Sequence, residues 1–253
     1  IWSDFWDLGT PDHFFSKFQL NYDLPMSKFP FLQFVRANYT YSGDFDYQRG
    51  SQTLLQLAHH DINTLQNGNT HNLTANLTFD QLYRYLGVKP TPRGEKTSLG
   101  KSLLTMVKTG GVNYSVTKAR TLPGYTQQVG FLGTLKPSWN FMLGDQTDLR
   151  YEMAKNGYLT DFVDFNDQYI SSKEEQLLIT ANLQPITDLQ INLKGNKQYS
   201  ENYTETFEVR NFVYNKLVGN QVGSFNISTN LIATAFNKID EYNSAAFKRF
   251  KDN

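Results

Sequence analysis

The side chains that could do chemistry in this chain are few and scattered. His59, His60 and Asp61 are adjacent, but neighbouring residues on a strand point to opposite faces and no second group of ligands joins them. The pair Glu174 and Glu175 carries no sign of the burial that an acid–base pair needs. An oxygen-rich stretch has the composition of a calcium loop without the EF-hand spacing: Asp161, Asp164, Asn166 and Asp167. We interpret all three groups as ordinary polar segments.

Recognisable catalytic motifs are missing as well. The sequence has no phosphate-binding glycine loop, no nucleophile elbow and no zinc-protease motif. It has no cysteine, which removes disulfides and thiolate metal ligands. We therefore expect a protein that is not an enzyme and that needs no cofactor and no metal.

Composition narrows the class of protein further. The 253 residues include 24 basic and 24 acidic side chains, and this balance argues against a nucleic-acid partner, which needs a basic surface. Charged residues make up 19%, below the roughly 25% of typical soluble domains, whereas aromatic residues reach 15%. Few charges and many aromatic residues suit strands with one face in lipid and one face in water. They also suit a secreted β-protein.

Alternation of apolar and polar residues gives the clearest structural signal. It is strongest in two runs separated by the short break 185–188; the apolar positions are Leu177, Ile179, Ala181 and Leu183, then Leu189, Ile191 and Leu193. Each run predicts a strand with one apolar and one polar face, about as long as the roughly 9–11 residues that cross a membrane. The same pattern recurs near residues 17–26, 35–47, 73–79, 112–117, 203–209 and 225–227, so we expect about eight strands and an all-β fold.

Other segments lack this alternation. We expect a loop with one helical turn over 49–68, an exposed loop over 89–98, and a helix over 98–107 with Ser98 as a possible N-cap. The division that follows is 1–120 strands with loops, 121–176 an irregular element, 177–229 strand hairpins, and 230–253 a short helix with a polar tail. If the apolar faces lie in lipid, the strands of 1–120 and 177–229 are transmembrane, and 121–176 lies in a lumen or caps one end.

A series of short motifs lies within and around the irregular element. Its members are Pro123, Gly124, Tyr125, Gly144, Gln146, Asp148, Arg150, Asn156, Gly157, Pro185, Asp188, Asn202, Glu205 and Phe207. In this order and spacing the series resembles the SprA (Sov) family, the outer-membrane translocon of the Bacteroidetes type 9 secretion system. The resemblance is densest over residues 110–210.

The resemblance implies a structural role for these residues and a function for the chain. The family forms a very large transmembrane β-barrel, so this chain would be one segment of the barrel wall in the bacterial outer membrane. Members export folded proteins and some support gliding motility. Implied partners are the remainder of the barrel, a PorV-type outer-membrane shuttle protein, a periplasmic plug protein, secreted cargo proteins and membrane lipid.

Two other classes of protein account for the same strands. One is a soluble or cell-surface β-sandwich that binds glycans or proteins, with the apolar faces packed inward. The other is a small stand-alone porin closed from these strands alone. Alternation by itself does not choose among the three, because it does not say what the apolar face contacts.

Overall fold

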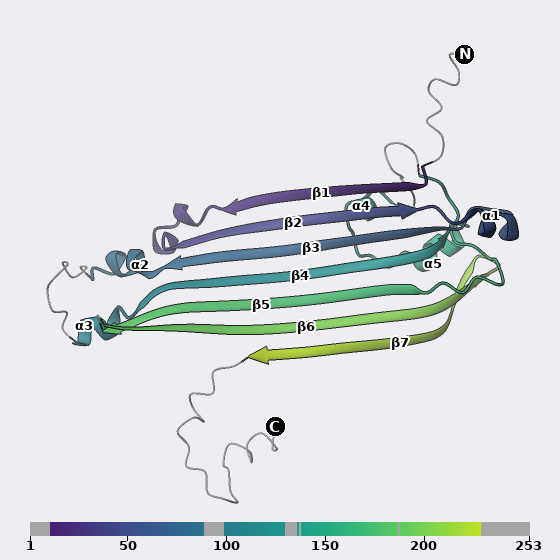
Figure 1. The fold of residues 1–253 in the computed structure, drawn as a ribbon. Coiled ribbons are helices and arrows are strands. Elements are labelled where there is room, and N and C mark those ends of the chain that lie inside the picture. Colours follow the sequence, from purple (N-terminus) through teal and green to yellow (C-terminus); the bar gives the residue numbers. More distant parts are fainter. Residues whose placement is uncertain (1–10, 89–98, 130–135, 137, 187, 229–253) are drawn as a thin grey trace, which may run out of the picture.

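Seven long strands form a single antiparallel sheet in the computed structural model, which describes residues 11–88, 99–129, 136, 138–186 and 188–228 (Figure 1). The strands are β1 (His13–Leu24), β2 (Val35–Gln48), β3 (Asn63–Thr78), β4 (Val107–Tyr125), β5 (Tyr169–Ile186), β6 (Leu189–Arg210) and β7 (Val213–Ser228). Each strand pairs with the next one along the chain, in the order β1 to β7. The all-β class expected from alternation is confirmed.

The two edge strands have no further partner among the described residues. β1 pairs only with β2, and β7 pairs only with β6. The outer backbone groups of both strands are therefore available for pairing with another strand.

The sheet has seven strands and not the expected eight, because two of the expected strands form one continuous strand. Residues 189–194 and 203–209 both belong to β6, which continues through the polar stretch between them. The alternation persists there, but with charged and aromatic residues on the face that is apolar elsewhere, as at Lys197, Tyr199 and Glu201.

Several boundaries also differ from expectation. β3 begins at Asn63, inside the expected loop 49–68, which contains a helix α1 (Gln52–Ala58) capped by Ser51. The expected helix over 98–107 is α3 (Leu99–Leu104), and β4 begins at Val107. Ser98, the loop 89–98 and the tail 230–253 lie outside the described residues.

Short helices occupy the connections at both ends of the sheet. The remaining ones are the 3-10 turns η2 (Met26–Lys28) and η3 (Pro30–Leu32), and the helices α2 (Phe79–Tyr85), α4 (Trp139–Met142) and α5 (Arg150–Lys155). Figure 1 places α2 and α3 at one end and α1, α4 and α5 at the other.

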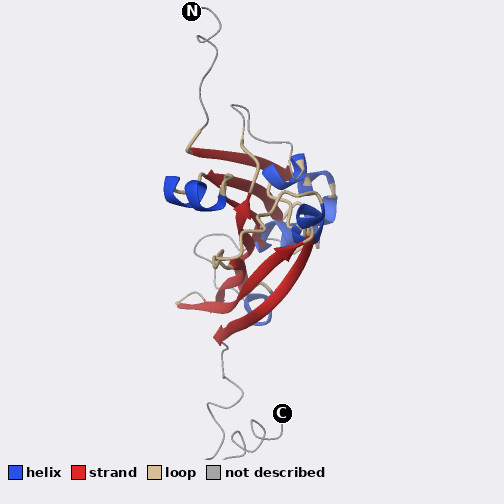
Figure 2. Ribbon diagram, turned by 90° about the vertical axis from the view of Figure 1, so that its right-hand side faces the viewer, coloured by secondary structure: helices blue, strands red, loops and turns tan. Residues whose placement is uncertain are grey.

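The irregular element covers one end of one face of the sheet. β4 continues to Tyr125 and β5 begins at Tyr169, so the connection between them is 126–168, shorter than the expected 121–176. Figure 2, a view along the strands, shows the sheet nearly edge-on with helices and loops beside it, and the core places α4 and α5 against the side chains of one face. We call that face the covered face and the other the open face. The covering segment is the described part of the connection, residues 126–129, 136 and 138–168.

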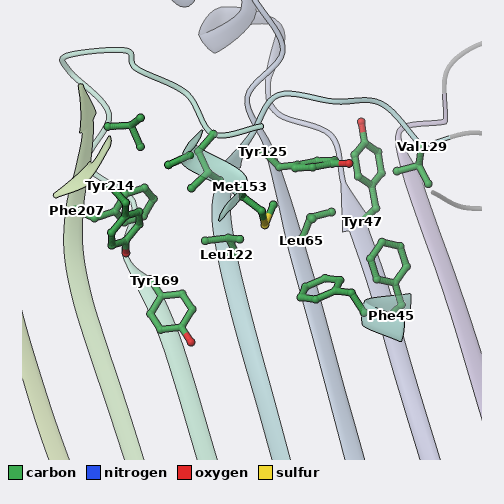
Figure 3. Packing of buried hydrophobic residues seen from close by; sticks show 14 of the residues in the cluster. Phe45, Tyr47, Leu65, Leu122, Tyr125, Val129, Met153, Tyr169, Phe207 and Tyr214 are labelled. Carbon is green, nitrogen blue, oxygen red and sulfur yellow. The ribbon is translucent and has the colours of Figure 1, made fainter. Parts of the chain in front are cut away.

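The main core lies between the covering segment and the sheet. Figure 3 shows Phe45, Leu65 and Leu122 of neighbouring strands directed to the side on which Met153 of α5 lies. Tyr125, Tyr169, Phe207 and Tyr214 extend this core across the sheet. Burying such side chains contributes about 1.5–3 kcal/mol each, so the covering segment is held largely by the hydrophobic effect.

Turn length does not distinguish the two ends of the sheet. Only two residues separate β5 from β6, and the β6–β7 turn at the opposite end is equally short. In the latter, Asn211 and Phe212 both have positive φ, 51° and 63°, and join the paired residues Arg210 and Val213. These values match a type I′ turn, whose twist suits a tight hairpin.

Candidate functional site

An exposed band of large apolar side chains is the main candidate for a functional surface. It lies on the covered face beyond the covering segment, and its members are Phe18, Leu20, Tyr22, Leu73, Tyr114, Ile179, Ile191, Phe225 and Ile227, each at least 36% exposed. The register places them on one face: Tyr22 pairs with Tyr39, Tyr39 with Leu73, and Leu73 with Tyr114. We call this set the apolar band.

The height of the apolar band matches that of a membrane. On β5 the apolar positions of this face extend from Leu177 to Ile186, which is ten residues. At about 3.4 Å per residue and a tilt of about 40°, ten residues rise about 26 Å, close to the roughly 25 Å apolar belt of outer-membrane barrels.

The border of the apolar band farther from the covering segment is aromatic. Phe34 contacts Phe79 with ring centroids 5.6 Å apart, and Tyr83 of α2 lies 6.4 Å from Phe79. The Tyr83 hydroxyl donates to the carbonyl of Val107 at 3.0 Å. Rings with wet hydroxyls are enriched where lipid meets water.

The open face has the opposite character. Opposite the apolar band it consists largely of small neutral polar side chains: Thr40, Ser42, Thr70, Asn72, Thr74, Asn76, Asn113, Ser115, Thr117, Thr180 and Asn182. Apolar side chains that depart from this pattern on the open face include Phe15, Ile170, Leu178, Val213, Val218 and Val222. A surface of small hydroxyls and amides is hydrated and offers little apolar area for adhesion.

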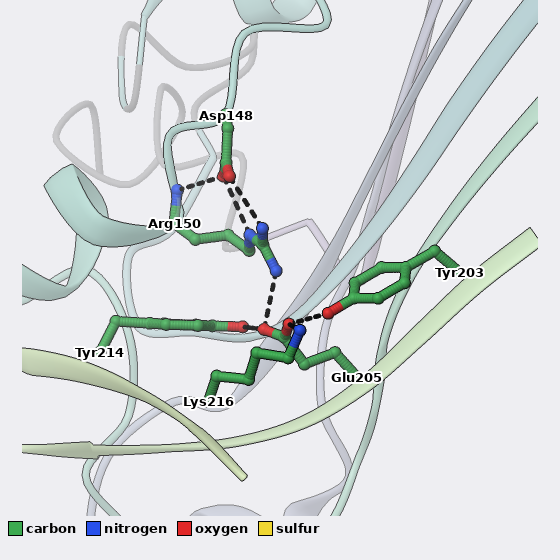
Figure 4. Close-up of polar contacts among 6 residues, drawn as sticks. All are labelled: Asp148, Arg150, Tyr203, Glu205, Tyr214 and Lys216. Carbon is green, nitrogen blue, oxygen red and sulfur yellow. Dashed lines mark hydrogen bonds and ion pairs between the residues drawn. The ribbon is translucent and has the colours of Figure 1, made fainter. Parts of the chain in front are cut away.

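A buried ion pair fastens the covering segment to the sheet. Arg150, the first residue of α5, places Nη1 2.7 Å from Oε1 of Glu205 on β6, and its Nη2 lies 2.8 Å from Oδ2 of Asp148 (Figure 4). Glu205 is only 2% exposed. The guanidinium also lies over the ring of Tyr169, 4.1 Å from its centroid. We call Asp148, Arg150 and Glu205 the clamp.

Hydroxyl groups complete the surroundings of Glu205. The Tyr214 hydroxyl donates to Oε1 at 2.6 Å, and the Tyr203 hydroxyl donates to Oε2. Lys216 Nζ lies 3.5 Å from Oε2. Both carboxylate oxygens therefore have several partners, as a buried charge requires.

These contacts fix the ionisation of the cluster. Burial alone raises the pKa of Glu205, but the hydrogen bonds from Tyr203 and Tyr214 and the charge of Arg150 outweigh it, so the pKa lies below its ordinary value. Burial, and then the hydrogen bond to Glu205, raise the pKa of the Tyr214 phenol. At neutral pH Glu205 is therefore ionised, and Tyr214 beside the clamp keeps its phenolic proton.

Amide side chains bind the other half of the covering segment. Asn67 Nδ2 donates to the carbonyls of Phe141 and Asp145 at 3.1 and 2.7 Å, and Asn69 Nδ2 donates to that of Gly144 at 2.8 Å. These asparagines lie on β3 and are buried. They satisfy carbonyls of α4 and its C-terminal turn that would otherwise lack partners.

Backbones meet directly beneath these bonds. An added Cβ at Gly43 would lie 1.9 Å from the carbonyl oxygen of Leu143, and Gly144 has a φ of 92°. Only glycine at these two positions allows the approach and the turn.

The structure brings together most of the motif residues named from sequence. Asp148, Arg150 and Glu205 form the clamp, while Tyr125 and Phe207 lie in the core. The other members near the covering segment are Pro123 and Gly124 at the end of β4, Gly144 and Gln146 beside Asn67, and Asn156 and Gly157 after α5.

Three motif residues lie elsewhere. Pro185 and Asp188 are at the β5–β6 turn, at the end of the sheet opposite the covering segment. Asn202 is exposed on the open face of β6. These three residues share no site with the clamp.

Side chains considered as metal ligands have structural contacts instead. His59 ends α1 in the left-handed conformation, and His60 Nε2 lies 2.7 Å from Oγ1 of Thr160. Across the part of the chain that the structure describes, no three His, Asp or Glu side chains gather as metal ligands. Asp161, Asp164 and Asp167 are included in that statement.

The acid–base pair is separated as expected from strand geometry. Glu174 accepts a hydrogen bond from Gln198 at 3.2 Å on the open face. Glu175 lies on the covered face, 2.6 Å from Lys173 Nζ. The two carboxylates therefore cannot act together as an acid–base pair on one bound group.

Sequence reasoning missed the polar residues that complete these contacts. Tyr203, Tyr214 and Lys216 around Glu205 were not selected, nor were Asn67 and Asn69. The spacing of two among Tyr203, Glu205 and Phe207 was the available signal, because it places all three on one face.

The sequence was compared with family models and with curated proteins. No family model matches the chain, and no curated protein matches it significantly. Among the described helices, none is long and apolar enough to cross a membrane.

Proposed function

We propose that the chain is a section of the wall of a very large outer-membrane β-barrel that exports folded proteins. The observation that carries the proposal is the apolar band. It is exposed on one face of a sheet whose other face carries mainly small, hydrated polar side chains. Lipid covers the apolar band, and the open face lines a wide aqueous lumen. The resemblance to the SprA family supplies the type of export, type 9 secretion.

The unpaired edges support a place within a larger barrel. Each unsatisfied backbone group in lipid costs several kcal/mol, so a spanning sheet must be closed. β1 and β7 have 12 and 16 residues and both need neighbours. Strands from the remainder of the same barrel supply them in this proposal. A stand-alone porin would require β1 and β7 to pair with each other, which they do not do.

The position of the covering segment follows from the same assignment. It lies on the covered face, the face that carries the apolar band, and so belongs to the outside of the wall, above the lipid, and not to the lumen. There it is placed to meet partners at the membrane surface. By resemblance those partners include a PorV-type shuttle protein, while a periplasmic plug and secreted cargo contact the pore.

Cysteine substitution tests the assignment of the two faces. The 253 residues contain no cysteine, so the labelling of each single variant is read as the increase over the intact polypeptide without the substitution. Ile179→Cys and Thr180→Cys are neighbours on β5 that point to opposite faces. In native membranes we expect a membrane-impermeant maleimide to label Thr180→Cys and not Ile179→Cys, with both labelled after denaturation. Equal labelling of both would contradict a lipid-covered band.

Deletion of the gene tests the export activity. In a strain that secretes folded proteins by the type 9 route, we expect cargo to accumulate in the periplasm and complementation to restore secretion. Normal secretion in the deletion strain would remove this function. A monodisperse soluble monomer of the chain without detergent would favour the β-sandwich alternative.

A further inference from the structure

A row of basic side chains borders the apolar band on the covered face. Lys118 on β4 pairs directly with Lys173 on β5, and Lys197 on β6 pairs with Leu177 of β5 and with Ile227 of the band. We call Lys118, Lys173 and Lys197 the basic row. Lys118 and Lys173 lie on the side of Tyr114 and Leu177 that faces the clamp, and Lys197 lies at the edge of the band itself.

Side chains of the protein neutralise this row only in part. Lys173 pairs with Glu175 at 2.6 Å, and Glu175 has Lys118 and Lys197 as diagonal neighbours across the strands. Like charges directly opposite on adjacent strands, such as Lys118 and Lys173, destabilise a sheet unless an anion lies between them. Lys118 and Lys197 are exposed, and neither forms an ion pair with a described residue.

Arg120 adds a further positive charge next to the basic row, two residues after Lys118 on β4. It lies on the same face of β4 as Lys118, and its Nε is buried without a hydrogen-bond partner among the described residues. Around the basic row and the clamp the carboxylates are Glu175, Glu201, Glu205 and Asp148, the last of which lies beside Arg120. The cations there are Lys118, Lys173, Lys197, Arg120, Arg150 and Lys216. Six cations and four carboxylates leave an excess of two positive charges at this border of the apolar band.

We infer that the basic row binds the phosphate-bearing headgroups of anionic lipids. The inference rests on the proposed function, because it requires the apolar band to lie in the acyl chains. Lipid headgroups are the anions held at a fixed height above such a band, and long lysine side chains reach them with their stems against apolar surface. The opposite border, with Phe79 and Tyr83, is aromatic, so the two borders of the band differ in chemistry.

The binding of anionic lipid by the basic row can be tested by measuring lipid selectivity. The intact polypeptide that contains this chain is reconstituted in mixed vesicles of phosphatidylcholine and phosphatidylglycerol, with either lipid spin-labelled. We expect the motionally restricted fraction to favour phosphatidylglycerol. K118Q/K197Q should reduce the preference at least fivefold, since each lysine near an anionic surface is worth about a fivefold factor.

A matched variant controls for total charge. K155Q/K194Q also removes two exposed lysines, one on α5 and one on the open face of β6. We expect it to retain the preference. Equal loss in both variants, or no preference in the parent protein, would overturn the inference. So would binding of water-soluble glycerol phosphate as tight as that of the lipid.

The same measurement separates this inference from the proposed function. A restricted population of both lipids without preference means that the band contacts lipid and the basic row does not select it. Absence of any restricted lipid means that the band does not lie in a membrane, and both proposals fail.

Discussion

The covered and bare ends of one sheet face carry the same kinds of side chain with opposite burial. Near the covering segment Phe45 and Tyr47 are 0% and 1% exposed, whereas Phe18 and Tyr22 are 42% and 52% exposed. All four lie on β1 or β2 and point to the same side. The difference shows that alternation sets the face of a side chain, while a separate element sets its environment. At one end that element is the covering segment, and at the other no described residue of the chain covers the apolar side chains.

The largest effect is expected when an aromatic ring is removed from the core beneath the covering segment. Phe45→Ala leaves a cavity under α4, where Phe45 meets Phe141 with centroids 6.1 Å apart. Such a change costs about 3–5 kcal/mol. Hydrogen exchange of the covering segment measures the loss as a lower free energy of detachment. Phe18→Ala, on the bare end, should leave that exchange unchanged, and an equal effect would mean that the two ends are not separate.

Removing one partner of the clamp should be nearly as costly. Arg150→Met leaves Glu205 as a buried charge with less compensation, which costs about 3 kcal/mol. Arg150→Met/Glu205→Met should recover much of this, because no charge remains buried. The exposed pair Arg210–Glu208, at 2.8 Å, provides the control, since Arg210→Met is expected to change stability by less than about 1 kcal/mol. Equal losses for Arg210→Met and Arg150→Met in thermal melts would show that the clamp has no special weight.

A smaller effect is expected from an added methyl group at the backbone contact. Gly43→Ala forces Leu143 away from β2, and overpacking of this kind costs about 1–3 kcal/mol. Limited proteolysis of the covering segment should become faster. Gly195→Ala, where nothing lies within 4 Å, should leave the proteolysis rate unchanged. If Gly43→Ala also left the proteolysis rate of the covering segment unchanged, the close approach of Gly43 to Leu143 would be contradicted.

The smallest expected effect is a dependence on pH. The pKa of Glu205 is lower in the folded state, so its contribution to stability is full above the ordinary carboxyl value of about 4.3 and is lost as the pH falls through the folded value. Each unit of difference corresponds to about 1.4 kcal/mol. Hydrogen exchange of the covering segment should therefore accelerate below about pH 4 once corrected for intrinsic rates. Glu205→Gln should abolish this component.

Much of the sheet could be predicted from sequence, because alternation directly reports two-sided strands. The pattern at 177–194 predicted the second half of β5 and the start of β6, whereas residues 169–176 of β5 lie within the stretch expected to be irregular. The first half of β3 could not be found this way, since Asn63, Asn67 and Asn69 are unusual in strands. The amides of Asn67 and Asn69 donate to carbonyls of α4 and its turn, more than 70 residues away, and the amide of Asn63 donates to the carbonyl of Gln127.

The clamp shows a different limit of sequence analysis. Asp148, Arg150 and Glu205 were all selected as members of a motif series, but their contact was not predicted. Arg150 and Glu205 are 55 residues apart, and their meeting depends on how α5 packs against β6 and β7. No local pattern encodes that packing.

The sequential strand order has a consequence for how the sheet forms. Each strand pairs with the one synthesised just before it, so the growing edge is always the most recent hairpin and no later strand must be inserted between earlier ones. Loop closure between neighbours costs little entropy, which favours rapid, ordered pairing. A sheet of this kind can lengthen from one edge, hairpin by hairpin, and the proposed barrel would need a long-range pairing only once, when its last strand meets its first.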